Sequence, residues 1–438
     1  MARSLAEWLA LQEAAHPKSI DLGLARVGEV ARRLGVDRPR CAVITVGGTN
    51  GKGSTVAHLE ALWLAAGRSA GLFTSPHFLR YNERIRIDGV EAEDAAIVAA
   101  FERIEAARGA TTLTFFEYNT LAALQLFAQR GVELALLEVG LGGRLDATNL
   151  VDADVSVVCS VGLDHRDWLG ETVEEIGAEK AGIFRAARPA VLGTASMPAS
   201  VYATIARLGA KPIVAERDFG WQLGPAAGAA PRWSYRGARL NLADLPPSAL
   251  AGSIQYRNAA TALAALEALA NAGGRSSAAA QVVAALDTQT VAAGLRRVRL
   301  PGRFQIVPGP VEWILDIAHN PPAAEVLAAQ LAQRPCQGRT LAVVGILGDK
   351  DAPAIAHALA PAVQGWFLCS LDGPRGISAA ELASRVGADV HDPVLAGSVG
   401  AACEAARAAA RAGDRVIVCG SVHTVGPALE WLGVYSAG

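Results

Sequence analysis

The sequence predicts an α/β protein with two domains: a mostly parallel N-terminal sheet with helices on both faces, and a smaller C-terminal Rossmann-like α/β domain. Strand-like apolar runs alternate with helical segments through the first half of the chain, and a second alternating series begins after a Pro-Gly pair at 301–302. Such alternation is typical of parallel sheets joined by right-handed crossovers. A length of 438 residues also exceeds one ordinary core, so two domains are expected.

The strand-like runs of the first half are short and strongly apolar. They cover residues 41–46, 134–139, 154–161, 187–193 and 211–215. Residues 216–250 are rich in Gly, Pro, Trp and Tyr with short alternations, which is typical of a hairpin excursion. A strong helix is expected at about 258–272, with Gly273 and Gly274 as its stop.

The domain boundary is predicted near residue 297, within the basic stretch 291–303. Residues 1–297 would then form the first domain, and residues 298–438 would form a second one of ordinary domain size. Its strand-like runs are FQIVPG, EWILDIA, TLAVVGIL, GWFLCSL and DRVIVCG.

The amino-acid composition indicates which kind of binding partner to expect. Apolar residues make up 51% of the chain, charged residues 19%, and the formal net charge is −2. This balance provides no electrostatic footprint for nucleic acid or an anionic membrane, so small-molecule partners are expected. No run reaches about 18 uncharged apolar residues and the start is not basic, so we expect a cytoplasmic protein. The six cysteines lie far apart and are expected to be reduced core thiols.

Residues 41–66 combine an apolar run, a glycine-rich turn with one lysine, and a helical segment beginning at Ser54. Glycines let consecutive backbone N–H groups converge on an anion, the helix N-terminus adds partial positive charge, and Lys52 adds a full one. The strict G-x-x-x-x-G-K-[ST] pattern fails, because Val46 stands in place of its first glycine and Gly53 follows the lysine. A plain β-to-α turn with a surface lysine is the alternative. The flanking pattern favours a nucleotide phosphate loop and a P-loop ATPase-like N-terminal domain.

Glu138 ends an apolar strand one crossover from this loop, where a magnesium-binding acid is expected. One alternative is that Glu138 is a solvated loop acid. The other is that residues 140–145 form a second glycine-rich nucleotide-binding motif, but Leu145 stands where the third glycine would be and excludes it. His165 follows the next strand. It is either a magnesium or phosphate contact or a hydrogen-bonded surface histidine, and expected strand adjacency with Glu138 favours the first.

Two further segments carry charge. Lys180 lies on a predicted helix with several acids, so a solvated helix face is its default interpretation. The segment 75–89 contains His77, Arg80, Arg84 and Arg86, which could grip an anionic substrate or form a basic edge strand.

The segment DIAHNPP lies between a strand and a helix of the second domain. Asn320 followed by Pro321 predicts a helix N-cap, which explains that asparagine structurally. Asp316 and His319 remain available for chemistry.

Nine motifs follow one another along both predicted domains. They are GTNGKGST, TSPHFLRYNERIRI, EVGLGGRLDATN, LDHRDWLG, EKAGIF, LPGRF, DIAHNP, GILGDKD and CGSVHTVG. The ordered set resembles the bacterial bifunctional dihydrofolate synthase/folylpolyglutamate synthase family, a branch of the Mur ligase superfamily.

The resemblance implies site residues position by position. The ATP-contacting positions would be Gly51, Lys52, Gly53, Ser54, Asn258, Arg303 and Asp316. The magnesium positions would be Ser75, Glu138 and His165, and the dihydropteroate positions would be Leu113, Thr114, Phe115, Phe116, Leu145, Asp146 and Ala147. Lys180 matches a lysine that is carbamylated in relatives, and Lys52, His165 and Lys180 would be the catalytic residues. His319 and His423 match family motifs without a defined role for His423, and Ile254 and Gln255 depart from the common pattern near the adenine.

The implied activity is ATP-dependent ligation of L-glutamate to 7,8-dihydropteroate and to reduced folates through an acyl phosphate, with Mg²⁺ as two ions. Residues 1–297 would bind ATP and the pterin, and residues 298–438 would close over ATP and glutamate. Relatives indicate a monomer. Two alternatives stay open: a Mur-type peptidoglycan amino-acid ligase and a non-catalytic nucleotide-switch binding protein.

Overall fold

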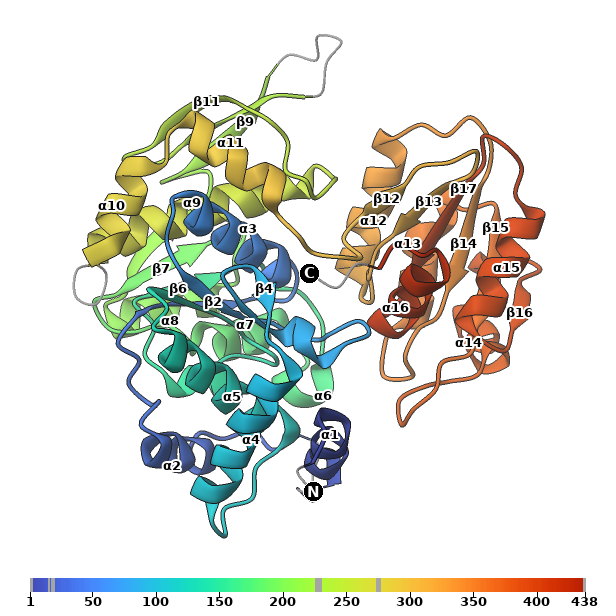
Figure 1. The fold of residues 1–438 in the computed structure, drawn as a ribbon. Helices are drawn as coiled ribbons and strands as arrows, with labels where there is room; N and C mark the ends of the chain where they lie inside the picture. Colours follow the sequence, from blue (N-terminus) through green and yellow to red (C-terminus); the bar gives the residue numbers. More distant parts are fainter. Residues whose placement is uncertain (1–2, 15, 17–19, 225–230, 273–276, 436–438) are drawn as a thin grey trace.

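The computed structural model describes residues 3–14, 16, 20–224, 231–272 and 277–435. It contains an eight-stranded sheet, a three-stranded sheet and a six-stranded sheet, and the last of these lies apart from the other two (Figure 1). The prediction of a mostly parallel N-terminal sheet and a separate, smaller C-terminal α/β unit is confirmed.

The eight-stranded sheet has the order β4-β3-β2-β5-β1-β6-β7-β8. Its parallel strands are β1 (Ala42–Gly47), β2 (Ala70–Phe73), β5 (Leu134–Glu138), β6 (Val155–Val158), β7 (Pro189–Leu192) and β8 (Lys211–Val214). β3 (Ile85–Ile87) and β4 (Val90–Glu91) are antiparallel. All six residues of β1 are buried, so the segment after β1 begins at the centre of the sheet.

Two expectations about this sheet are wrong. β5 and β6 both pair with β1, so the strands that precede Glu138 and His165 flank β1 and are not neighbours. β3 pairs on both sides and therefore is not a basic edge strand, because the two-residue β4 takes the edge. Both the order of the strands around β1 and the position of β3 depend on pairing between distant segments. A local sequence pattern carries no information about such pairing.

Helices cover both faces of the sheet, and the alternation along β1 separates two cores. Ile44 packs in one core with α3 (Lys52–Ala65), α9 (Ile254–Ala272), α10 (Ser277–Ala285) and α11 (Thr288–Arg297). Val43 packs in the other core, with α1 (Leu5–Ala14), α2 (Ala25–Leu34), α4 (Asp94–Arg108) and α5 (Phe115–Arg130). The remaining elements are η1 (Tyr81–Arg84), η2 (Ala147–Leu150), α6 (Arg166–Leu169), α7 (Val173–Ala181) and α8 (Ala199–Leu208).

The expected hairpin excursion is confirmed as an antiparallel sheet of β9 (Gly220–Leu223), β10 (Trp233–Arg236) and β11 (Asn241–Leu245). Trp233 and Tyr235 are buried in the same core as α9, which anchors this sheet to the first domain. α9 begins at Ile254, four residues before the predicted start, and its predicted stop at Gly273 and Gly274 lies outside the described residues.

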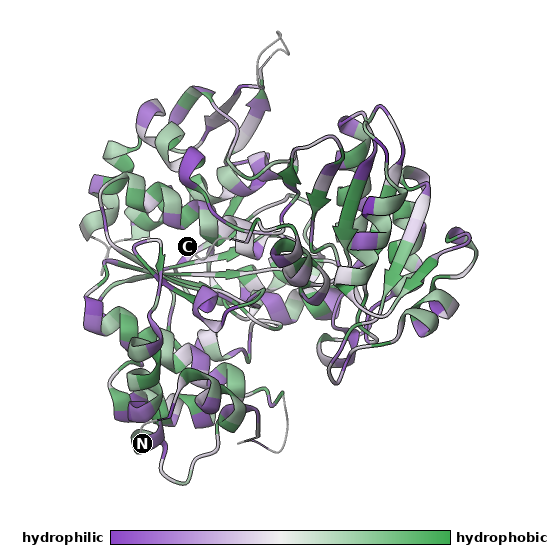
Figure 2. Cartoon of the chain, turned by 45° about the vertical axis from the view of Figure 1, so that its right-hand side comes forward, coloured by the Kyte–Doolittle hydropathy of each residue, from purple (hydrophilic) through white to green (hydrophobic). Residues whose placement is uncertain are grey.

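The C-terminal sheet has the order β12-β13-β17-β14-β15-β16 and is parallel except for β12. Its strands are β12 (Gln305–Val307), β13 (Glu312–Leu315), β14 (Thr340–Val344), β15 (Gly365–Cys369), β16 (Val394–Ala396) and β17 (Arg415–Cys419). Its helices are α12 (Pro321–Gln333), α13 (Ala352–Leu359), η3 (Ala360–Ala362), α14 (Ala379–Val386), η4 (Gly387–Asp389), α15 (Val399–Ala409) and α16 (Val422–Trp431). Apolar strands lie between partly polar helices (Figure 2).

Two features of the composition have structural counterparts. Cys159, Cys369, Cys403 and Cys419 are buried and free, whereas Cys41 and Cys336 are only partly buried. Among the described residues, every helix is too short or too polar to span a bilayer.

Candidate active site

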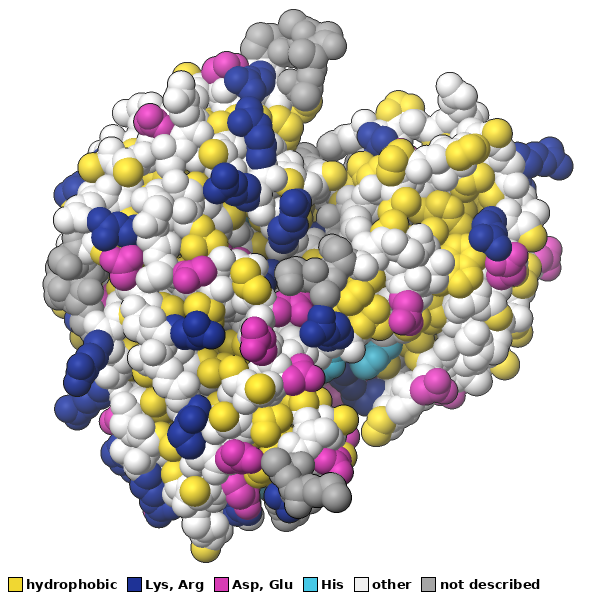
Figure 3. Space-filling model, in the orientation of Figure 1, with side chains coloured by type: hydrophobic (Ala, Val, Ile, Leu, Met, Phe, Trp, Pro, Cys, Tyr) yellow, Lys and Arg dark blue, Asp and Glu magenta, His cyan; other side chains and the backbone are white. Residues whose placement is uncertain are grey.

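A cavity of about 630 Å³ lies where the two domains meet. The phosphate loop, the ends of β2 and β5, the start of α9, the segment around Arg303 and the start of α12 line it. Figure 3 shows the hollow between the domains, with histidine side chains visible in it. The carboxyl ends of parallel strands therefore supply the site, as expected for an open α/β sheet.

The loop after β1 has the conformation of an anion cradle. Gly48 and Gly51 have φ values of +138° and +90°, and a Cβ on Gly48 would lie 3.1 Å from the backbone nitrogens of Cys159 and Ser160. α3 begins at Lys52 directly after Gly51, an N-cap residue that has no side chain with which to cap the helix. Lys52 Nζ donates to the carbonyls of Gly48 at 2.9 Å and Thr49 at 3.1 Å. An uncapped helix N-terminus with an adjacent ammonium is suited to phosphate.

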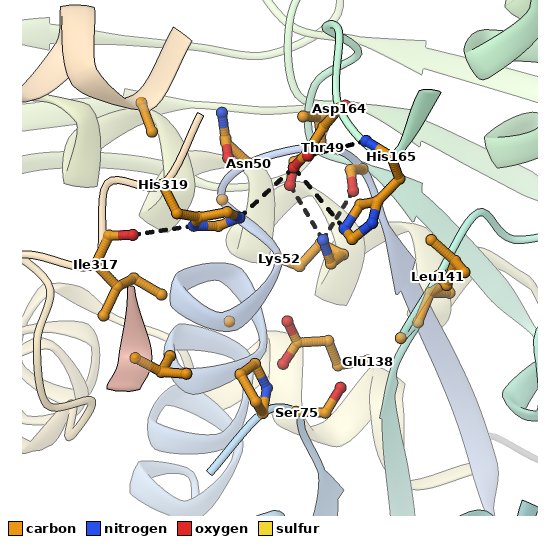
Figure 4. Close-up of a pocket in the computed structure, with 18 of the residues that line it drawn as sticks. Thr49, Asn50, Lys52, Ser75, Glu138, Leu141, Asp164, His165, Ile317 and His319 are labelled. Atoms are coloured by element: carbon orange, nitrogen blue, oxygen red, sulfur yellow. Dashed lines mark hydrogen bonds and ion pairs between the residues drawn. The ribbon is translucent and has the colours of Figure 1, made fainter. Parts of the chain in front are cut away.

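Glu138 and Ser75 lie together beside this loop (Figure 4). The Glu138 carboxylate is buried and accepts a hydrogen bond from the Thr74 hydroxyl. Burial raises the pKa of Glu138, while Lys52, Thr74 and Arg303 oppose the shift. A buried carboxylate next to a serine hydroxyl is a fitting oxygen donor set for Mg²⁺.

His165 adds a neutral imidazole on the other side of the loop. Burial lowers its pKa to about 4, and the positive charges of Lys350 and Lys52 lower it further against Asp164. A ring nitrogen with a free lone pair can bind a metal ion. Within the described ranges no group of three or more His, Cys, Asp or Glu side chains forms a ready metal cluster. The residues therefore fit an ion that also takes phosphate and water as ligands, which is the usual coordination of Mg²⁺.

Lys180 on α7 is buried, which overturns its default interpretation as part of a solvated face. The side chain is 4% exposed and Nζ donates to the Gly48 carbonyl at 3.2 Å. Burial lowers the pKa of Lys180 to about 7, with repulsion from Lys52 as the next cause. A substantial fraction of this amine is therefore neutral near pH 7.

Asp164 joins the two domains at the cavity. Lys350 Nζ lies 2.7 Å from Asp164 Oδ1, both side chains are 7% exposed, and Asn320 Nδ2 donates to Oδ2 at 2.9 Å. Burial alone would raise the pKa of Asp164, but His319, His165 and Lys350 together hold it well below its usual range. In the sequence Lys350 is part of the GILGDKD motif, and no local pattern pairs it with Asp164.

Arg303 and Asp316 lie at the connection between the domains. Asp316 accepts hydrogen bonds from the backbone nitrogens of Phe304 at 2.8 Å and Ala318 at 2.9 Å. These bonds hold the backbone next to Arg303, whose guanidinium nitrogen would lie 3.5 Å from a Cβ on Gly53. Burial lowers the pKa of Arg303, with Asp316 and Glu138 opposing the shift. Asn258 lies near Gly51, so all of these predicted positions meet around the phosphate loop.

One end of the cavity is apolar and lies within the first domain. The predicted pterin residues that line it are Thr114, Phe115, Phe116, Leu145, Asp146 and Ala147. Leu113 does not line it: this side chain is 1% exposed in the core, and Glu117 lines the cavity instead. The predicted stretch is therefore one residue out of register, because Thr114 caps α5 and Leu113 points inward before it.

The charged side chains of Asp146 and Arg84 differ in their hydrogen-bond partners. Asp146 accepts hydrogen bonds from the backbones of Gly140, Leu141 and Thr148 and from the Thr148 hydroxyl at 2.6 Å. It therefore holds the lining loop in shape. Arg84 lines the cavity, donates through Nε to His77 Nδ1 at 2.7 Å and lies over the Phe115 ring.

Several residues that were not predicted as site residues also line the cavity. The segment Ile20–Gly23 and Gln330 line it without any prediction from sequence, since neither contains a motif. Ile254 and Gln255, the departures from the family pattern, line it as well. His319 lines the cavity, whereas His423 is not among its lining residues.

Comparison with known proteins supports this geometry. Residues 46–208 match the Mur ligase middle domain and residues 302–422 match the Mur ligase glutamate ligase domain. The fold and the site are thus those of a Mur-type ligase. The Escherichia coli (strain K12) dihydrofolate synthase/folylpolyglutamate synthase is 44% identical over 98% of this chain and 96% of its own.

Solved structures agree along the whole length. E. coli FolC in complex with DHPP and ADP superposes with a TM-score of 0.89 at 44% identity, covering 99% of this chain and 98% of that one. A bifunctional folylpolyglutamate synthase/dihydrofolate synthase with Mn, AMPPNP and L-glutamate bound has a TM-score of 0.86 at 42% identity, covering 98% of each chain. This chain belongs to the dihydrofolate synthase/folylpolyglutamate synthase family.

Proposed function

We propose that this protein is an ATP-dependent ligase that joins L-glutamate to 7,8-dihydropteroate and to reduced folates through an acyl-phosphate intermediate. The observation that carries the proposal is the uncapped N-terminus of α3 with Lys52, which opens into the same cavity as Glu138 and the apolar end at Phe115 and Phe116. One cavity thus offers a triphosphate cradle and a slot for a flat ring system. The ligands named for the solved relatives are the nucleotides ADP and AMPPNP, DHPP, and the amino acid L-glutamate. The nucleotides match the phosphate cradle, and DHPP matches the slot for a ring system.

The chemistry starts from a poor electrophile, since a carboxylate resists attack by an amine. Lys52 and the first N–H groups of α3 would neutralise charge on the γ-phosphoryl group as it moves to the carboxylate. Arg303 lies beside Gly53 and adds a second cation at the same place. The neutral amine of glutamate then attacks the acyl phosphate, and the tetrahedral intermediate collapses to amide and phosphate.

Glu138, Ser75 and His165 would hold magnesium, in our proposal as two ions. When bound, Mg²⁺ supplies Lewis-acid stabilisation of the phosphoryl and acyl oxygens. We further propose that Lys180 is carbamylated, because its buried amine has a depressed pKa and no carboxylate within hydrogen-bond reach in the described residues. The carbamate would convert a buried cation into an anion that faces the cradle.

Arg84 supports the acid substrate in this proposal. Its guanidinium is buried and its pKa is lowered chiefly by burial. Across the described residues its hydrogen bond goes to His77 and no ion pair neutralises it. A desolvated cation in the cavity wall attracts a substrate carboxylate.

The proposed division of labour follows the domains. Residues 1–297 supply the cradle and the pterin end, and residues 298–438 close over ATP and glutamate, with Lys350 and His319 at the junction. A monomeric state and a cytoplasmic location stay predictions.

Phosphate release distinguishes the candidate functions. Purified protein would be mixed with ATP, Mg²⁺ and glutamate plus dihydropteroate, or with the UDP-linked muramoyl substrate of a peptidoglycan ligase. We expect release only with dihydropteroate or a reduced folate. Turnover with the muramoyl substrate alone would establish the Mur-type alternative, and no ATP consumption with any acid would establish the nucleotide switch.

Lys52→Ala should lower both ligase activities about a hundredfold or more, because a charge aimed at the transferring phosphoryl group is lost. Lys211→Ala, at an exposed position of β8, is the matched control and should turn over like the wild type. Thermal melting would show that both variants fold. Normal turnover by a folded Lys52→Ala variant would contradict the assigned role.

A further inference from the structure

One loop of the first domain packs on the second domain. Residues 75–80 follow β2, and Figure 1 shows this blue loop extending toward α16. The Phe78 side chain in this loop packs on the apolar core that contains Val425 and Leu429 of α16. The chemistry proposed above does not use Phe78, so its place between the domains has another cause.

Two glycines of the second domain leave room for Phe78. A Cβ on Gly302 would lie 2.8 Å from two ring carbons of Phe78 and 2.8 Å from a methyl group of Val425. A Cβ on Gly426 would lie 2.9 Å from the carbonyl oxygen of Phe78. Side chains at these two positions would collide with the loop. Gly302, Val425 and Gly426 therefore form a seat for this ring, which we call the Phe78 seat.

A single carboxylate holds the loop in this position. Glu83 accepts hydrogen bonds from the three consecutive backbone nitrogens of residues 78–80, at 2.7 to 2.8 Å. The same carboxylate accepts a hydrogen bond at 2.7 Å from the hydroxyl of Tyr435, which lies in the second domain. Hydrogen bonds to an ionised group are roughly twice as strong as neutral ones. The backbone that carries Phe78 is therefore fixed in shape where it meets the second domain.

The residues on either side of Phe78 in the chain line the cavity. Ser75, proposed for magnesium, and Arg84, proposed for the acid substrate, both do so. From the second domain, Arg303 lines the cavity and directly follows Gly302 of the Phe78 seat. One apolar contact outside the chemistry thus joins the segment of Ser75 and Arg84 to the segment of Arg303.

We infer that Phe78 is a positioning residue, whose ring in the Phe78 seat holds the two domains at the separation that ligation requires. The inference rests on the proposed function and adds the contact that sets the distance across the cavity. Burial of an apolar ring favours the closed arrangement, because the ring meets water when the domains part. A misplacement of about 1 Å between reacting groups can cost roughly a hundredfold in rate, so such a contact affects turnover.

The test combines small-angle scattering with ligase kinetics on the full chain. Phe78→Ala empties the Phe78 seat, so the radius of gyration should increase and kcat should fall by about tenfold or more. Calorimetry with inorganic tripolyphosphate and Mg²⁺ should show affinity within about twofold of the wild type, because the cradle lies in the first domain. Phe78→Leu refills most of the seat and should restore the wild-type radius and most of the turnover.

Leu208→Ala is the matched control, because Leu208 is also a partly buried apolar side chain that packs on a core of the first domain. It should lower the melting temperature and leave the radius of gyration and kcat unchanged. Should Phe78→Ala fail to fold, Phe78→Val replaces it with the same expected directions.

The outcomes separate the inference from the function on which it rests. A folded Phe78→Ala or Phe78→Val protein with the wild-type radius and kcat would overturn the inference, since a lower melting temperature alone indicates a purely structural role. Loss of turnover that Phe78→Leu does not restore would also overturn it. A wild-type protein that releases no phosphate with dihydropteroate or a reduced folate would overturn the proposed function, while scattering would still test the seat.

Discussion

Single residues of the site differ most in how their charge is compensated. Lys180 has three acids nearby in sequence, yet Glu174 and Glu175 are exposed while Lys180 faces the loop carbonyl of Gly48. Burial lowers the pKa of Lys180 to about 7, and repulsion from Lys52 is the next cause. The free amine is therefore neutral above about pH 7 and protonated below it. Since only the neutral amine reacts with CO₂, burial prepares this lysine for carbamylation.

Isotope-labelled bicarbonate tests this expectation directly. At fixed dissolved CO₂, label on Lys180 should increase as the pH rises through about 7, because the neutral fraction increases there. Lys180→Ala should lose most activity and regain part of it with short carboxylates such as acetate. Lys211→Ala should keep the label and the activity. A protein without label at any pH, or a Lys180→Ala variant that acetate does not rescue, would count against the carbamate.

At the scale of elements, α3 is the part that the rest of the first domain holds in place. His58, one turn after Ser54, is completely buried; its Nδ1 donates to the Ser54 carbonyl at 2.7 Å. Its Nε2 then accepts from the Ser248 hydroxyl at 2.9 Å, in the segment that leads to α9. Burial lowers the pKa of His58 to about 4, so the ring stays neutral and keeps both bonds. The first turn of α3 is thereby tied to the segment that precedes α9.

These two hydrogen bonds of the neutral His58 ring should make folding stability depend on pH. The folded state holds a neutral His58 down to about pH 4, whereas the unfolded chain binds a proton below about 6.5. The stability that this residue contributes is therefore complete above about 6.5 and is lost as the pH falls toward 4. His58→Gln should show a shallower loss, by up to about 1.4 kcal/mol per pH unit, in urea unfolding between about pH 5 and pH 7.

Ser248→Ala separates titration from packing, because it removes one partner of His58 and leaves the ring in place. It should lower stability at every pH and keep the slope of the wild type. A His58→Gln variant with an unchanged slope would show that other groups carry the acid sensitivity.

At the scale of the whole molecule, the two domains meet through polar contacts around the cavity and through Phe78, which packs on a core of the second domain. Asp164 pairs with Lys350, Asn50 exchanges hydrogen bonds with Asn320, and the Tyr435 hydroxyl donates to Glu83 at 2.7 Å. Polar interfaces between domains permit relative motion, and ligands then select the closed arrangement. The Asp164–Lys350 pair lies at the cavity, so closure and chemistry share one contact.

Lys350→Met should open the cleft, because it removes the cation that pairs across the domains with the buried Asp164 carboxylate, a loss of up to about 3–5 kcal/mol for a buried pair. Small-angle scattering should report a larger radius of gyration, and KM should rise. The double variant Asp164→Asn/Lys350→Met should recover part of the closed state. Arg232→Gln, in an exposed pair within one domain, is the control and should leave the scattering unchanged. A compact Lys350→Met protein would show that the other contacts suffice.

The sequence by itself determined the features that depend on neighbours along the chain. The apolar run and glycines at 41–53 define the strand and the cradle, and Asn320 before Pro321 caps α12 as expected, accepting from the Ala323 backbone at 3.0 Å. Alternating segments predicted both α/β units because hydrophobic periodicity reflects the face that each segment buries.

Only the tertiary structure decided which side chains meet across the chain. It placed β1 between the strands of Glu138 and His165, buried Lys180, and paired Asp164 with Lys350. These outcomes depend on strand order and on how two domains pack, whereas periodicity and capping signals extend over only a few turns. Charge compensation in the site is thus a property of the folded molecule, because desolvation acts only once distant segments enclose a group.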